Sequence, residues 1–227
     1  MSIAPESLEA SAPDAGAPAT SLAEHAYLQL RDKLIMLEIR PGDPLNDGRI
    51  AAELGIGRTP VREAIKRLES DHLVVSYPRR GTFATGVDIT ELADVSEIRE
   101  LLEPLAARRA AGMASPRLRQ ELRDVATAIG ALDGEATQHE LMRYDITVHR
   151  LIYKAAANPH LEDVLIRCDN LATRIWCLML DKIPSVSGHI TEHVELLNAI
   201  ADGNADLAAE LALHHVTSFE ESVRSVL

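Results

Sequence analysis

The sequence predicts a mainly α-helical protein, in which an N-terminal winged helix-turn-helix precedes an all-α helical bundle. Three observations lead to this prediction. Aromatic residues make up only 3% of the 227 residues, and the many alanines and leucines favour helices over a β-sandwich. Apolar residues recur at helical spacing along most of the chain. The β-prone runs are confined to two short stretches around a Pro-Arg-Arg-Gly turn at residues 78–81.

The composition also suggests where the protein works. Residues 1–20 are rich in Ala, Pro, Ser and acid, so we expect a disordered tail and not a secretory signal. No run of about 18 apolar residues occurs, so we expect no membrane span and a cytoplasmic protein. Cys168 and Cys177 are nine residues apart in a helical stretch, roughly 13 Å by helical rise, which is too far for a disulfide. We expect buried thiols in a reducing cytoplasm.

We expect two domains, residues 21–86 and 87–227, which differ in charge. The formal net charge of −12 argues against DNA binding if taken alone. Residues 21–86, however, carry 10 Lys and Arg against 9 Asp and Glu, whereas residues 87–227 carry 13 against 23. The acid therefore belongs to the second domain, and the first can present the local basic surface that contact with phosphate requires.

The first domain begins with two predicted helices. Ser21–Leu37 has a mostly apolar stripe and a capping-box pattern, and it is broken by the Pro- and Gly-rich residues 40–44. A shorter helix is predicted over Asn46–Leu54, with Gly55 as its stop. A third helix follows after a tight turn. Short helices joined by a turn that contains Gly make a helix-turn-helix.

The third predicted helix, near residues 57–68, divides its residues between two faces. Thr59 can cap its start and Pro60 suits its first turn. One stripe is apolar: Val61, Ala64, Ile65 and Leu68. Beside Thr59, a second face carries the basic residues Arg58, Arg62 and Lys66. A helix that enters the DNA major groove needs this division, because Arg and Lys serve phosphates and guanine edges. An ordinary solvated face is the alternative.

A β-hairpin is predicted next, with strands at residues 74–77 and 82–85. Arg79, Arg80 and Gly81 lie at its turn. A hairpin directly after a recognition helix is a wing, and its basic tip can enter the minor groove or hold phosphate. A solvated turn without function is the alternative.

Residues 24–86 resemble the winged helix-turn-helix of the GntR family of bacterial transcription regulators. The resemblance is carried by residues 40–45 (RPGDPL), 58–69 (RTPVREAIKRLE) and 80–82 (RGT), although Gly57 stands where the family usually has Ser or Thr. It implies DNA contact by Arg58, Thr59 and Arg62, with the wing near Arg80 and Gly81. A regulator of this kind is expected to be a homodimer on double-stranded DNA with a palindromic operator.

The second domain is predicted to be a bundle of six helices with short connections. Their expected ranges are Asp88–Ala111, Pro116–Leu132, Glu135–Ala157, Leu161–Asp181, Thr191–Ala201 and Ala205–Val226. In the first of them, five apolar residues fall close to helical spacing: Leu92, Val95, Ile98, Leu102 and Leu105.

A candidate metal site lies in this domain. Asp145 and His149 are at i, i+4 and share a helix face, while His193 and the His214-His215 pair come later. One carboxylate with two or three imidazoles suits zinc, nickel or a similar ion. Spacing alone is weak support, because a single His is more often structural and Asp145 can equally be a salt-bridge partner.

Residues 92–222 resemble the FCD ligand-binding domain of the FadR-type branch, in its smaller six-helix variant. Matching stretches include residues 97–103 (EIRELLE), 144–152 (YDITVHRLI) and 202–205 (DGNA). Domains of this branch often hold a divalent metal with one Asp and three His, which implies the ligands Asp145, His149, His193 and His215. The branch typically binds small carboxylates or sugar acids. Arg99 and Arg174 are candidate partners for such an anion, with a structural salt bridge as the alternative for each.

The sequence thus predicts a DNA-binding transcriptional regulator, in the first place a repressor, with an effector-binding second domain and no catalytic residues. A metal-dependent hydrolase or lyase on the helical bundle is the competing function. A purely structural metal, or none, is a third possibility.

Overall fold

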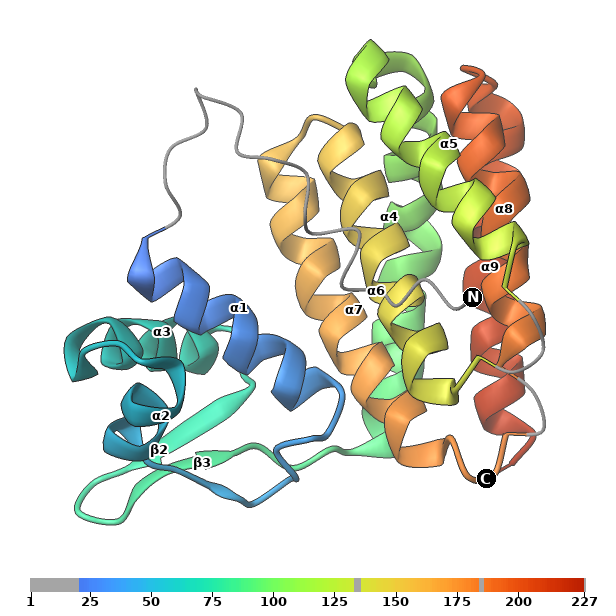
Figure 1. The fold of residues 1–227 in the computed structure, drawn as a ribbon. Helices are drawn as coiled ribbons and strands as arrows, with labels where there is room; N and C mark the ends of the chain where they lie inside the picture. Colours follow the sequence, from blue (N-terminus) through green and yellow to red (C-terminus); the bar gives the residue numbers. More distant parts are fainter. Residues whose placement is uncertain (1–20, 133–135, 184–185, 227) are drawn as a thin grey trace. The chain divides into compact units, whose positions relative to one another are not determined.

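The computed structural model describes residues 21–132, 136–183 and 186–226, and the expected disordered tail lies outside this range (Figure 1). The described chain forms two compact units. Residues 21–34 and 42–85 form the first, and residues 35–41 with 86–226 form the second. No described helix has the length and apolar character needed to cross a membrane.

The first unit combines three helices with a small antiparallel sheet. The helices are α1 (Leu22–Ile35), α2 (Asp47–Leu54) and α3 (Arg58–Ser70), and the strands are β1 (Pro44–Leu45), β2 (Val74–Tyr77) and β3 (Gly81–Ala84). The strand order is β1-β3-β2, with Val74 opposite Ala84 and Pro44 opposite Phe83. The winged helix-turn-helix is therefore confirmed. The two-residue strand β1 was not predicted, since it is too short to show a period in sequence.

The helix ends show which capping predictions hold. Helix α2 ends at Gly55, as predicted, where φ is 66°; its start is capped by the side chain of Asn46, which was not predicted. The prediction that Thr59 caps α3 is wrong, because α3 begins at Arg58 and its N-cap is Gly57, which has no side chain to offer. The first helix ends at Ile35, earlier than predicted, because Leu37 adopts a left-handed conformation with a φ of 56°.

Gly55 makes the turn between α2 and α3 possible, and its replacement tests that role. A Cβ at Gly55 meets no atom within 4 Å, so Gly55→Ala adds only the strain of a left-handed alanine. We expect the mutant to lose about 1 kcal/mol of unfolding free energy in urea denaturation. Gly57→Ser is the matched control at the next turn position, where an added hydroxyl can cap α3 and raise stability by a few tenths of a kcal/mol. Equal stability of Gly55→Ala and the parent would contradict this role.

The second unit is a bundle of six α-helices within the described residues. A 3-10 turn (Ile89–Glu91) precedes them, and they are α4 (Leu92–Met113), α5 (Pro116–Gly130), α6 (Gln138–Ala155), α7 (Pro159–Met179), α8 (Ser187–Ala201) and α9 (Ala205–Arg224). Helix α4 packs against α6, α7, α8 and α9, and α5 packs against α8 (Figure 1). Cys168 and Cys177 of α7 are free thiols. The predicted all-α bundle is therefore confirmed.

Helix α4 buries a different face from the one its large apolar residues indicated. Leu92 and Val95 are buried, but Ile98 and Leu105 are 41% and 44% exposed. The buried face consists largely of small residues and one charged pair: Ser96, Arg99, Glu103, Ala106, Ala107, Ala110 and Ala111. Alanines allow neighbouring helices to approach closely, and buried charges are tolerated when they are paired. The face of α4 that carries Ile98 and Leu105 is left exposed.

Candidate DNA-binding surface and metal centre

Helix α3 has the two faces that its sequence predicts. Val61, Ala64, Ile65 and Leu68 are buried against the rest of the first unit. The side chains of Arg58, Thr59, Arg62 and Lys66 are exposed. One surface of the helix therefore offers three cationic groups and a hydroxyl to a partner.

Arg67 belongs to the structural side of α3. Its guanidinium pairs with Glu24 of α1 and lies over the ring of Tyr27, 3.8 Å from the ring centroid. The Tyr27 hydroxyl donates a hydrogen bond of 2.8 Å to Asp71. Burial, reinforced by the Asp71 carboxylate, raises the pKa of Tyr27 to about 12, so this hydroxyl remains a donor at neutral pH. Arg67 thus holds α1 against α3 and is not part of the candidate DNA surface.

Asp47 of α2 holds the two arginines of the candidate DNA surface. Its carboxylate accepts from Arg58 Nη2 at 2.8 Å and from Arg62 Nε at 2.5 Å. These hydrogen bonds keep the pKa of Asp47 below its usual value. Both arginine side chains are more than 60% exposed, and exposed ion pairs are weak, so a phosphate or a guanine edge can replace Asp47. These ion pairs therefore hold both guanidiniums side by side and leave them accessible to a partner.

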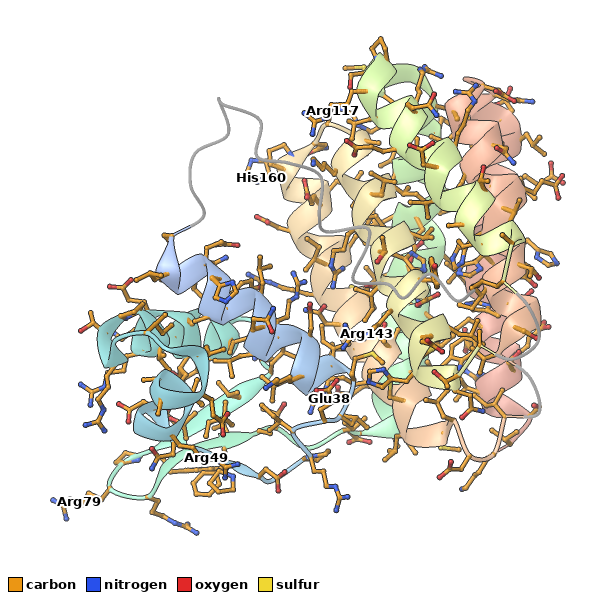
Figure 2. All side chains as sticks on the ribbon, viewed as in Figure 1. Glu38, Arg49, Arg79, Arg117, Arg143 and His160 are labelled. Carbon is orange, nitrogen blue, oxygen red and sulfur yellow. The ribbon has the colours of Figure 1, made fainter. Side chains whose placement is uncertain are left out.

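The wing presents its arginines at the turn between β2 and β3. Arg79 adopts a left-handed conformation with a φ of 62° and points outward from the tip of the hairpin (Figure 2). Arg80 lies over the ring of Tyr77, 5.7 Å from its centroid. Gly81 has a φ of 100°, a conformation that side chains disfavour, so the turn depends on glycine there. All three predicted wing residues are exposed.

The four predicted metal ligands come together inside the second unit. Asp145 and His149 are on α6, His193 is on α8 and His215 is on α9, and one ligand atom from each lies within 4.8 Å of the other three. All four side chains are buried. The structure thus joins residues from three helices that are separated by up to 70 positions in sequence.

The spacing of these atoms matches the size of a coordinated ion. His149 Nε2 lies 3.7 Å from Asp145 Oδ1 and 3.3 Å from His215 Nε2, and His193 Nε2 lies 3.8 Å from Asp145 Oδ1. Ligand atoms about 2.1 Å from a tetrahedral metal are about 3.4 Å apart. Asp145 Oδ1 and both ring nitrogens of His193 have no hydrogen-bond partner among the described residues. Buried polar atoms left in this state fit a missing cation.

Two carboxylates contact the ring nitrogens of His149 and His215 that point away from the centre. His149 Nδ1 lies 3.2 Å from Glu103 Oε2, and His215 Nδ1 lies 3.3 Å from Glu192 Oε2. Tyr153 donates a 3.0 Å hydrogen bond to Glu103, which also accepts from Arg99 Nε at 2.6 Å. A carboxylate on the far nitrogen fixes the imidazole tautomer and raises its basicity as a ligand. Both rings therefore turn Nε2 toward the shared centre.

The charges around the centre favour a cation. Once His149 has lost its proton, Arg99 and Arg150 supply two positive charges against the three carboxylates of Glu103, Asp145 and Asp169, with Arg150 Nη1 2.8 Å from Asp169. Burial raises the pKa of Asp145 to about 6. It also lowers the pKa values of His193 and His215 well below their usual range, so both imidazoles are neutral at pH 7 and can each offer a lone pair to a metal.

His149 is the exception among these imidazoles. Burial alone would lower its pKa, but the charges of Glu103, Asp169 and Asp145 outweigh that effect and raise it to about 9. A metal that binds here must therefore displace a proton from His149.

Sequence reasoning missed several residues that surround the centre. His189, which was not singled out from the sequence, has its ring stacked on His215 with centroids 3.9 Å apart, and its Nε2 lies 3.7 Å from Asp145 Oδ1. Trp176 lies against His189, with centroids 4.4 Å apart. Glu103 and Glu192 were also not singled out. Of the two adjacent histidines, His215 is buried in the cluster, whereas His214 is exposed.

The two predicted effector arginines are both buried in the second unit. Arg99 pairs with Glu103, and its Nη2 lies 4.0 Å from Asp169. This is the structural salt bridge that the sequence left open. Burial lowers the pKa of Arg174, and the charge of Glu91 opposes this shift. Neither arginine is one of the four clustered residues. Their role in binding an effector therefore stays a prediction.

Comparisons with known proteins agree with both units. Residues 22–84 match the gntR family of bacterial regulatory proteins, and residues 94–218 match the FCD domain. The HTH-type transcriptional repressor RspR of Escherichia coli K12 is 24% identical over 92% of this chain and 92% of its own length. The HTH-type transcriptional regulator LutR of Bacillus subtilis is 26% identical over 81% of this chain and 93% of its own.

Solved structures show the same fold. E. coli McbR/YncC superposes with a TM-score of 0.78 at 20% identity, covering 91% of this chain and 99% of that one. A GntR regulator from Rhodococcus sp. RHA1 has a TM-score of 0.68 at 22% identity, covering 90% and 98%.

Proposed function

Because the chain belongs to the GntR family of bacterial transcription regulators and carries an FCD domain, we propose that it is a homodimeric repressor controlled by a small carboxylate or sugar acid. The first unit binds a palindromic operator through α3 and the wing. The second unit binds the effector through a divalent metal, zinc or nickel. The matched relatives are transcription regulators, and this chain is a regulator and not an enzyme, which removes the hydrolase or lyase alternative.

The observation that carries the metal-dependent part is the buried group of Asp145, His149, His193 and His215. Its unsatisfied oxygen and nitrogen atoms, and the surplus of carboxylates around it, support a divalent cation there. Such a cation supplies a Lewis-acidic site for a carboxylate oxygen. Glu103 and Glu192 fix the orientation of the imidazoles of His149 and His215. The buried surroundings strengthen the attraction between cation and anion.

Helix α6 supports a route from the effector to the DNA-binding unit. It carries Asp145 and His149, and near its start His139 Nε2 and Arg143 Nη2 lie 3.1 and 3.6 Å from Glu38 (Figure 2). Glu38 belongs to residues 35–41, and the chain continues at both ends of this segment into the first unit. An effector that binds one arrangement of α6 more tightly would shift the population of arrangements and thereby the affinity for DNA.

A thermal-shift screen tests the proposed effector class. We expect small carboxylic and sugar acids to raise the melting temperature of the metal-loaded protein by about 5–10 °C at 100 times their Kd. The matching neutral amides should have no effect, because they lack the charge that the metal attracts. Protein treated with a chelator is the second control. An equal response of chelated and metal-loaded protein would contradict effector binding through the metal.

A further inference from the structure

Helix α4 carries an apolar stripe that the described part of the chain leaves partly exposed. Ile98, Leu101 and Leu105 are 41%, 71% and 44% exposed, and Leu101 is the most exposed large apolar side chain among the described residues. They follow one another at i, i+3 and i+7, so they lie on one side of the helix. Single exposed leucines are ordinary, but three in a row on one helix mark a contact surface.

Charged residues flank this stripe in a regular order. Asp94 lies seven residues before Leu101 and Arg108 lies seven residues after it, and both are exposed. Residues seven apart return to nearly the same side of a helix. Along its exposed side, α4 therefore presents two acids (Asp94 and Glu97), three apolar side chains and one base, with Leu101 midway between Asp94 and Arg108.

We propose that this α4 stripe is the two-fold interface between two copies of the chain, with the axis passing beside Leu101. The proposal rests on the homodimer in the proposed function and names its surface. In an antiparallel pair centred on Leu101, Asp94 faces the partner's Arg108, and Ile98 packs beside the partner's Leu105. A parallel pair would instead place Asp94 against the partner's Asp94. The charge pattern thus favours the antiparallel arrangement, in which one patch contacts its own copy.

The neighbouring helix α9 extends this patch. Arg108 already pairs with Asp206 of α9, and this pair is exposed at 50% and 90%. A guanidinium has five donors, so Arg108 can hold Asp206 and the partner's Asp94 together. Leu213 lies seven residues after Asp206 on α9 and is 42% exposed. A stable dimer buries about 800 Å² on each partner, so α4, about 33 Å long and about 10 Å wide, needs this edge of α9 to approach an area of that size.

Light scattering after gel filtration tests the interface without DNA. The parent should have twice the chain mass of 24.8 kDa, whereas Leu101→Glu and Leu105→Glu should have the mass of one chain. Leu178→Glu on α7 is the matched control, because Leu178 and Leu105 are both 44% exposed. It should stay dimeric. A dimer that survives both α4 substitutions, or that dissociates equally in the α7 control, overturns the interface.

Cross-linking keeps the proposal testable if a glutamate variant fails to fold. Residues on a two-fold axis meet their own copies, so Leu101→Cys should form a disulfide-linked dimer under mild oxidant, and Leu178→Cys should not. The native thiols interfere little, because burial raises the pKa of Cys168 and raises that of Cys177 to about 12. No cross-link in Leu101→Cys overturns the interface. DNA binding by the parent is measured separately, so failure of the interface and failure of the regulatory function are distinguishable.

Discussion

Replacing Arg58 and Arg62 together by Ala is expected to weaken operator binding by about 30-fold or more. Both guanidiniums lie exposed on α3, held side by side by Asp47. Two contacts to bases or phosphates worth about 1 kcal/mol each account for a loss of this size. If both arginines contact phosphate, the slope of log affinity against log salt should also fall by about 2. Fluorescence anisotropy with a labelled promoter fragment measures both quantities.

The matched control removes two positive charges from the second unit. Arg117 and Arg224 have side chains that are 79% and 59% exposed, similar to those of Arg58 and Arg62, and each is paired within its own helix. Arg117→Ala with Arg224→Ala should leave operator affinity within a few-fold of the parent. Equal losses in the two double mutants would mean that overall charge, and not the face of α3, governs DNA binding.

The second large effect is expected at His215, where replacement by Ala should abolish metal binding. His215 Nε2 lies 3.3 Å from His149 Nε2 in the buried cluster, so its loss removes one of four ligands. Elemental analysis should find about one metal ion per chain in the parent and almost none in the mutant. Metal at 100 times its Kd should raise the melting temperature of the parent by about 5–10 °C and leave that of the mutant unchanged.

The adjacent histidine offers a close control for this experiment. His214 is exposed, and its Nδ1 lies 3.4 Å from Ser218 Oγ and not in the cluster. His214→Ala should therefore bind metal like the parent. Full metal content in His215→Ala, or equal loss in both mutants, would show that the cluster is not the metal centre.

Local rules predicted the first unit well because its elements end at residues with strong backbone preferences. Gly55 ends α2, and Pro78 with Gly81 bounds the wing turn, so sequence locates these boundaries directly. The i, i+4 spacing of Asp145 and His149 similarly places both on one face of α6. Joining them to His193 and His215 required the family resemblance, because helical periodicity carries no information on which helices pack together.

The buried face of α4 was predicted wrongly, and the reason shows where helical periodicity fails to identify a buried face. Ile98 and Leu105 appeared to continue the buried stripe, yet the interior uses Arg99, Glu103 and small alanines. Buried charges look like surface residues in sequence until their partners are known, and Glu103 finds Arg99, His149 and Tyr153 only in the folded bundle. His189 was missed for the same reason, since its contacts come from α6, α7 and α9.

The central claim is that the metal centre of the second unit controls DNA binding by the first. The most direct test is operator affinity, measured by anisotropy at fixed salt for metal-loaded protein with and without an acid found in the thermal-shift screen. The parent should bind specifically, and the acid should change its Kd by about 5- to 150-fold. Asp145→Ala should bind the same DNA without responding to the acid. An unchanged Kd in the parent, or an equal response in Asp145→Ala, would contradict the claim.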